Sequence, residues 1–293
     1  MFDLNMIRIN QILIAGFLLV GILFVTTIPA SASNNLDSFP QKQVTFSKEP
    51  ISNEAVLYDR AKNGETDLFF DQSFMKNLTF NEELAKEFYI NNYVTTEKIK
   101  EIKELGQKGD SAKEESYVTT IFTDLSPKST TSSGSTYLEQ PSKDSSVSVT
   151  CTLRVYYSYR TDLVYSGNIP VNWYSAKLDR VQSKWTINDS QISIRNGFVR
   201  GTAYGKKVTS FDPHKEGALI THRGTASGEY SLISNPNPGT NYNYYPNWND
   251  WINVYPDATH VGGQADITIH RNPTGSSWNF SYPLKVNYNN FPN

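Results

Sequence analysis

The chain has 293 residues with 27 basic and 29 acidic side chains, a net charge of −2, and no basic stripe, so no nucleic-acid partner is expected. Its single cysteine excludes an intramolecular disulfide, and the fold must therefore depend on a hydrophobic core, which a chain of this length can bury. Aromatic residues make up 13% and charged residues 19%, a balance typical of an aromatic-rich β-protein with an uncharged polar surface.

Residues 1–32 have the pattern of a secretory signal peptide. The apolar run 12–25 follows Arg8 and precedes Ala30-Ser31-Ala32, which resembles a cleavage site. The run is shorter than the about 20 apolar residues that a membrane span needs. Cleavage predicts a secreted, extracellular protein that begins near Ser33 and has no stable membrane span. An uncleaved membrane anchor is the competing interpretation.

Residues 33–110 are predicted to be a helical N-terminal segment. Three short helices are expected over 52–64, 80–93 and 95–106, the first with Ser52 as its N-cap and the last with isoleucine and leucine at three-residue spacing. The segment is either a small helical subdomain or prosegment beside a larger domain, or a peptide-binding or autoinhibitory module.

Residues 111–147 are predicted to be a strand followed by a linker. The strand covers 116–125, and the residues after it are mostly Ser, Thr, Lys and Pro. Such a composition offers too little apolar area to compensate for the entropy lost on ordering. It separates the helical segment from the rest of the chain.

Residues 148–293 are predicted to be a β-sandwich domain. Apolar and polar residues alternate through 146–158 and again through 277–288, where Pro283 favours an edge position. The apolar phase slips near 188–190, which predicts a bulge or turn, and Asn196-Gly197 predicts a tight hairpin. Eight to ten short strands indicate a mainly β fold, a two-sheet antiparallel Ig-like sandwich, with a closed barrel as the alternative.

Three stretches carry a resemblance to known proteins. The strand CTLRVYYSY, the stretch VQSKWTINDSQISIRNG and the closing ITIHRNPTGSSWNFSYPLKVNY contain a Trp-bearing strand, a D-S-x-[ILV] step and a terminal basic-to-Trp hairpin. In these features residues 145–293 resemble a family of secreted Gram-positive proteins known only as uncharacterised. The resemblance implies a signal peptide, a variable N-terminal segment and a β-sandwich, and it implies no activity.

Motifs for catalysis were sought and not found. The chain has no nucleophile elbow, P-loop or dinucleotide-binding fingerprint. Cys151 lies in an alternating strand and is predicted to face the core as an unreactive thiol. The four histidines are scattered without a local pair, so neither a metal site nor a cofactor is predicted. No catalytic residue is assigned, although a carboxylate pair for glycosidic cleavage stays open.

The stretch NYNYYPNWNDWINVYPD, residues 241–257 and called the aromatic segment below, gathers aromatic and hydrogen-bonding side chains most densely. Aromatic rings stack on sugars, and Asn and Asp bind hydroxyls, which favours a ligand platform. The rings could instead plug the mouth of the sandwich, or form a surface for a partner protein. Ile252 and Val254 alternate with the neighbouring rings, so an inward aliphatic face would turn those rings outward. The candidate ligand-binding residues are Tyr242, Tyr244, Tyr245, Trp248, Asn249, Asp250, Trp251 and Tyr255.

The leading hypothesis is a secreted, non-enzymatic binding protein that acts at or near the cell envelope, with polysaccharide as the first candidate ligand. The alternative is a secreted hydrolase of cell-wall or extracellular polysaccharide that uses a carboxylate pair. A third hypothesis is a membrane-active protein that unfolds a Ser/Thr-rich hairpin within residues 116–158.

Overall fold

The structure is a computed structural model of the whole chain. The described residues all belong to one compact unit, Ser38–Asn293. Those residues are 41–68, 85–86, 88–105, 111–128, 147–166, 168–211, 214–223, 230–256, 259–272 and 275–290. The predicted signal peptide, 1–32, and most of the predicted Ser/Thr-rich linker lie outside the described residues.

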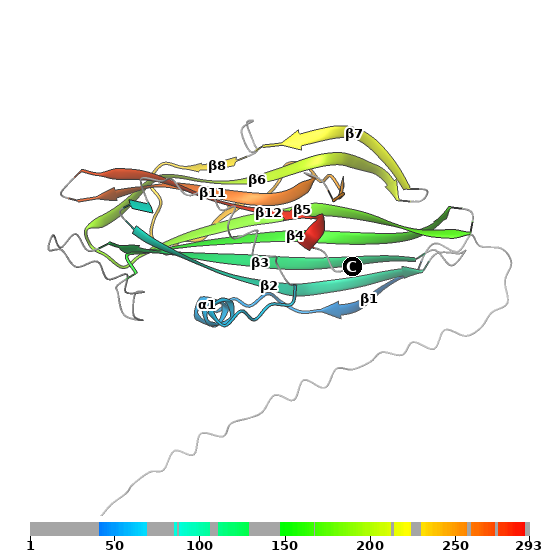
Figure 1. Cartoon of the computed structure of the whole chain (residues 1–293), viewed down its shortest axis with the longest axis horizontal. Helices are drawn as coiled ribbons and strands as arrows, with labels where there is room; N and C mark the ends of the chain where they lie inside the picture. The colour runs from blue at the N-terminus through cyan, green and yellow to red at the C-terminus, as the bar shows by residue number, and fades with distance from the viewer. Residues whose placement is uncertain are drawn as a thin grey trace, which may run out of the picture. The chain divides into compact units, whose positions relative to one another are not determined.

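The prediction of a mainly β chain is confirmed. Within the described residues, twelve antiparallel strands form one hydrogen-bonded sheet (Figure 1). Nine of them follow the order β1-β2-β3-β4-β5-β10-β6-β11-β12, while β7 and β8 pair with β6 and β9 pairs with β5. The strands are β1 (Gln41–Ser47), β2 (Phe88–Leu105), β3 (Ser111–Pro127), β4 (Val149–Ser166), β5 (Ile169–Ile187), β6 (Ile192–Phe211), β7 (His214–His222), β8 (Tyr230–Ile233), β9 (Tyr242–Tyr244), β10 (Ile252–Asn253), β11 (His260–Arg271) and β12 (Ser277–Asn287). The division into two separate Ig-like sheets is not confirmed, because β10 pairs with both β5 and β6.

The central strands are longer than the sequence predicted. Strands β2 to β6 contain 17 to 20 residues each. Bulges shift their register without ending them, for example between Tyr156 and Tyr157 of β4. The predicted Asn196-Gly197 hairpin is wrong for the same reason. Asn196 adopts a φ of 48° inside β6, at a shift of register against β11, so the left-handed residue serves a bulge rather than a turn.

Two local predictions about the later strands are confirmed. The phase slip near 188–190 is a turn between β5 and β6, in which the Asp189 carboxylate accepts a hydrogen bond from the Gln191 amide at 2.9 Å. Pro283 lies in β12, which pairs only with β11 and ends the path. An edge strand tolerates the missing amide proton of proline.

One of the predicted helices is present as α1 (Glu54–Lys62). Its N-cap is Asn53 rather than Ser52, because the Asn53 side chain accepts hydrogen bonds from the amides of Ala55 and Val56. Gly64 follows the helix with a φ of +71°, a conformation that glycine adopts without strain. In the described part of the chain, no helix combines the length and the apolar character needed to cross a membrane.

The helical prediction is wrong for 95–105 and for 88–93, and Gly106 lies outside the described residues. These residues form β2, which pairs with β1 on one side and β3 on the other. The run Val94-Thr95-Thr96 is β-branched and suits a strand. Strand β3 pairs along nearly the whole of β2, and β1 adds a second partner for Lys100–Leu105, so the pairing overrides the weak helical preference of the lysines and glutamates.

One hydrophobic core joins the two halves of the strand path. Gly263 of β11 faces β4 and β5, where a Cβ atom at this position would lie 2.7 Å from Val181 and 3.0 Å from Val155. The Tyr282 hydroxyl of β12 lies 2.6 Å from the Ser183 hydroxyl of β5. Figure 1 shows α1 outside this core, beside β2 and β3. A short 3-10 helix, η1 (Tyr288–Asn290), follows β12.

Cys151 is expected to resist thiol reagents in the native protein. Its side chain is fully buried in β4, and burial raises the pKa of the thiol far above its ordinary value. Iodoacetamide should therefore label Cys151 only after denaturation in guanidinium chloride, as followed by intact mass. Rapid labelling under native conditions would show that this part of β4 opens readily.

Candidate functional site

The aromatic segment lies between β5 and β6. At its start β9 pairs with β5, with Tyr244 opposite Val181, and further along β10 pairs with β5 and with Lys207 of β6. The Val208 amide of β6 donates to the Trp251 carbonyl at 2.8 Å. The segment therefore connects the two halves of the strand path.

The rings at the start of the segment pack into the core. Tyr244 is 3% exposed, and a Cβ atom at Gly201 would lie 2.7 Å from its ring, so only glycine permits this close approach. Tyr242 packs against the fully buried Trp185 with ring centroids 5.4 Å apart. Its hydroxyl accepts a hydrogen bond from the Asn237 amide at 2.7 Å. Tyr242 and Tyr244 therefore pack as expected if the rings of the aromatic segment act as a plug.

The middle of the segment is held by ring stacking and ion pairs. Trp248 stacks on His222 with centroids 4.2 Å apart and an interplanar angle of 4°. Asp250 lies 2.6 Å from Lys207 and 3.5 Å from His222. These contacts bring Trp248 and Asp250 together at His222, on strand β7.

The end of the segment follows the predicted alternation except at Asn253, which is buried like Ile252 and Val254. Ile252 and Val254 are buried, whereas Trp251 and Tyr255 are half-buried. The Trp251 ring meets the edge of Phe211 at 5.7 Å and a lysine ammonium at 5.5 Å. The most accessible side chains among the eight candidates are Tyr245, which is 64% exposed, and Asn249. Ligand binding by the eight candidates stays a prediction.

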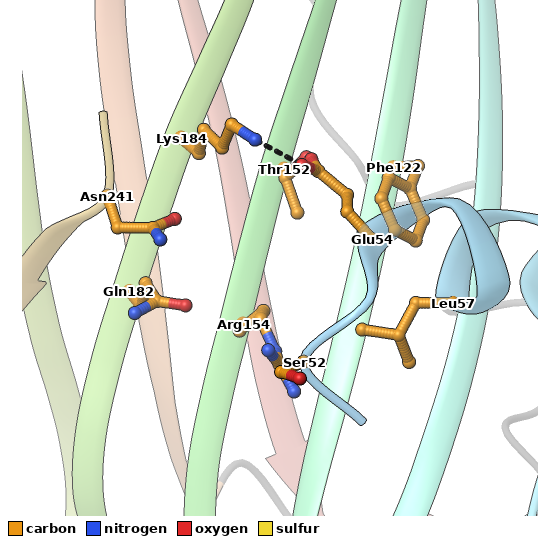
Figure 2. Close-up of a pocket in the computed structure, with 9 residues that line it drawn as sticks. All are labelled: Ser52, Glu54, Leu57, Phe122, Thr152, Arg154, Gln182, Lys184 and Asn241. Atoms are coloured by element: carbon orange, nitrogen blue, oxygen red, sulfur yellow. Dashed lines mark hydrogen bonds and ion pairs between the residues drawn. The ribbon is translucent and has the colours of Figure 1, made fainter. Parts of the chain in front are cut away.

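A second feature, which the sequence did not predict, is a hollow of about 100 Å³ beside the start of the aromatic segment. We call it the notch. It lies between α1 and the outer face of β3, β4 and β5, and Figure 2 shows its side chains converging from these elements. The notch is lined by Ser52, Glu54, Leu57, Phe122, Thr152, Arg154, Gln182, Lys184 and Asn241.

Glu54 and Lys184 form an ion pair across the notch (Figure 2). The Thr152 hydroxyl donates to the same carboxylate at 3.0 Å. Arg154 donates from Nη2 to the Ile51 carbonyl at 3.2 Å. The notch therefore presents a carboxylate and two cations in a small, partly buried space.

Two amide side chains form the opposite wall. The Gln182 side-chain nitrogen donates to Asn243 at 2.9 Å, and Figure 2 shows its amide oxygen turned toward the notch. Asn241 is exposed and is the residue that the aromatic segment contributes to the notch. Leu57 and Phe122 add apolar surface on the α1 side. The lining can donate and accept hydrogen bonds and can contact an apolar ring face.

The notch was missed because its residues come from distant parts of the chain. The alternation of 146–158 placed Thr152 and Arg154 on the polar face of a strand, which is correct, but a polar face alone predicts solvent contact. Only the position of α1 over that face makes a hollow. Asn241 could have been noticed as the first residue of the aromatic segment.

A buried group of carboxylates surrounds Arg160, away from the notch. Glu104 and Asp162 both contact Arg160, at 3.0 and 2.8 Å, but these three side chains are buried and do not line the notch. Within the described residues, no three His, Cys, Asp or Glu side chains gather into a group that could hold a metal ion.

Asp162 is expected to give the stability of the protein a pH dependence between about pH 4 and 6. Burial raises the pKa of Asp162 to about 6, although Arg160 opposes the shift. Since the folded-state pKa is raised, this contribution is fully present below about pH 4 and is lost as the pH rises through about 6. Asp162→Asn should therefore remove this slope from the unfolding free energies measured by urea titration at several pH values.

Glu101→Gln is the matched control for that experiment. Hydrogen bonds from Lys98 and Thr45 lower the pKa of Glu101 to about 2. Its contribution is therefore present above about pH 4.3 and is lost as the pH falls toward 2. Glu101→Gln should change only this acid range. An unchanged slope between pH 4 and 6 in Asp162→Asn would contradict the assignment to Asp162.

No protein-family model, curated protein or solved structure matches the chain.

Proposed function

We propose that the protein is a secreted, non-enzymatic binding protein that acts at or near the cell envelope and binds a polysaccharide in the notch. The observation that supports this proposal best is the lining of the notch. Hydroxyl, amide and charged groups face one another there, next to apolar carbons of Leu57 and Phe122. A sugar residue offers the matching surface, with hydroxyls around a ring and an apolar face.

The size of the hollow favours one residue of a longer chain as the occupant. About 100 Å³ holds part of a sugar ring, and the notch opens toward the exposed Asn241. A polysaccharide could place one residue in the notch while its neighbours lie on the surface. Exposed side chains of the aromatic segment, such as Tyr245 and Asn249, are further candidates for contact with the ligand.

Binding is favoured over hydrolysis because of the carboxylates. A glycosidase of the usual kind needs two carboxyl groups on either side of the scissile bond. In the described part of the chain, Glu54 is the only carboxylate that lines the notch, and it is held by Lys184 and Thr152. The signal-peptide pattern of residues 1–32 and the resemblance to secreted Gram-positive proteins support an extracellular site of action.

The experiment is a binding and turnover assay with the mature protein. Soluble Gram-positive wall polysaccharide, polygalacturonate and dextran are each included in native gels, and a retarded band reports binding. Parallel samples are assayed for new reducing ends. We expect retardation by at least one polysaccharide and no new reducing ends. Migration that no polysaccharide changes would contradict the binding function, and new reducing ends would favour the hydrolase.

A further inference from the structure

We propose that the notch selects acidic saccharides, and that Glu54 occupies the subsite for their carboxylate in the free protein. This inference rests on the proposed function, because it names the class of polysaccharide that the same notch takes. In the complex, the carboxylate of a uronic acid residue would replace the Glu54 carboxylate at Lys184 and Thr152. The hydroxyls of the same sugar would meet the amides of Gln182 and Asn241.

The contacts of Glu54 show that the subsite suits a carboxylate. One oxygen accepts from the Thr152 hydroxyl at 3.0 Å, and the other accepts from the Lys184 ammonium. Figure 2 shows the carboxylate reaching from α1 to β4 and β5. Charge-assisted hydrogen bonds of this kind are stronger than neutral ones, so an outside carboxylate would gain the same two contacts.

Arg154 offers a further hydrogen-bond donor for a second ligand oxygen. A guanidinium has five N–H groups. Here Nη2 donates to the Ile51 carbonyl and lies 3.6 Å from the buried Glu97 carboxylate, while Nε has no hydrogen-bond partner among the described residues. A buried donor without a partner is costly, and a ligand oxygen could satisfy it after a small rotation of the side chain.

The cations exceed the carboxylates in the lining of the notch. Arg154 and Lys184 are positive and Glu54 is negative, whereas Glu97 lies behind Arg154, fully buried and outside the lining. When the Glu54 side chain swings away, Lys184 faces the ligand without an ion-pair partner, while Arg154 keeps its contact with Glu97. An acidic saccharide would then be favoured over a neutral one of the same shape, because both make the hydroxyl contacts and only the acidic one gains the ion pair.

A ligand carboxylate can replace the Glu54 carboxylate while α1 stays packed on the sheet. Leu57 and Ala61 of α1 are buried against Phe122, in a small cluster separate from the main core. Tyr58 donates to Asp124, and Arg60 donates to Thr95 at 3.0 Å. These contacts lie beyond the first turn of α1, so they can hold the helix while the Glu54 side chain rotates toward solvent.

The test compares two matched oligosaccharides, oligogalacturonate and its neutral methyl ester, which has the same sugars and linkages, by isothermal titration of the mature protein. We expect the wild type to bind oligogalacturonate more tightly. Glu54→Gln should tighten oligogalacturonate binding by about fivefold, because the internal competitor loses its charge. Lys184→Met should weaken oligogalacturonate binding by about tenfold or more and change binding of the methyl ester less than about twofold.

Two control variants separate the subsite from general charge effects. Glu65→Gln removes an exposed carboxylate just beyond α1, and Lys215→Met removes an exposed ammonium on β7. Both should leave the ratio of the two affinities unchanged. If Glu65→Gln tightens oligogalacturonate binding as much as Glu54→Gln does, the role of Glu54 as internal occupant is overturned.

The outcomes also distinguish this inference from the proposed function. Equal binding of both oligosaccharides, with no response to Glu54→Gln or Lys184→Met, would overturn acidic selection and leave polysaccharide binding intact. If poly-L-glutamate binds as tightly as oligogalacturonate, the hydroxyl contacts contribute nothing. That result would overturn the inference that the ligand is a saccharide. Failure of the wild type and every variant to bind any of these probes or wall polysaccharide would overturn both proposals.

Discussion

Tyr244→Ala is expected to lower the free energy of unfolding by about 3–5 kcal/mol, the range found for large buried aromatic side chains. Tyr244 is 3% exposed and lies over Gly201 and within the main core. Its backbone pairs with β5, so the change leaves a cavity where the aromatic segment connects β5 to β6. Because the surrounding side chains belong to long paired strands, they can collapse only partly into that cavity.

Tyr245→Ala is the matched control, since it changes the neighbouring residue in the same way. Tyr245 is 64% exposed, and exposed substitutions usually change stability by less than about 0.5 kcal/mol. Urea denaturation followed by tryptophan fluorescence would measure both variants. Similar stabilities for the two variants would contradict the packing role of the start of the segment.

A fragment of residues 148–293 is expected not to unfold cooperatively, whereas residues 41–293 should do so. The predicted domain boundary near 148 falls between β3 and β4, which pair over nearly the whole length of β3. The fragment would lose Tyr117, Ile121 and Leu125, which belong to the same core as β4. It would also expose the edge of β4, and a long unpaired edge favours aggregation.

Expression of the two fragments, followed by gel filtration and urea unfolding, would check this expectation. The longer fragment contains every described element and is the control for expression and solubility. A soluble, cooperatively unfolding 148–293 fragment would show that β2 and β3 are dispensable for the core. That result would support the domain boundary before residue 148 that the composition of the linker predicted.

The elements that the sequence predicted correctly are those fixed by local patterns. Alternation around Cys151 gave the inward and outward faces of β4, and the dense alternation of 277–288 gave β12. The Asp189 turn and the glycine after α1 are local as well, because each depends on the conformation of a few residues. Such features need no knowledge of the neighbouring strands.

The features that the sequence did not predict depend on distant residues. In β2, Lys98 contacts both Glu101 and Glu115, and a register shift just after Lys98 brings residues three apart to one side of the strand. This shift imitates helical spacing, and only pairing with β1 and β3 reveals a strand. The notch likewise requires α1 to lie across β3, β4 and β5, from residues about 100 positions apart, as in the contact of Thr152 with Glu54.

The most direct test of the account is the affinity of two asparagine variants for wall polysaccharide, measured by isothermal titration. Asn241 lines the notch, whereas Asn235 is also exposed and lies outside it. Asn241→Ala is expected to raise the Kd by about fivefold, the effect of losing about 1 kcal/mol from one hydrogen bond, and Asn235→Ala is expected to leave the Kd unchanged. An unchanged Kd in Asn241→Ala, together with a raised Kd in Tyr245→Ala, would contradict the account and move the binding site to the exposed ring of the aromatic segment.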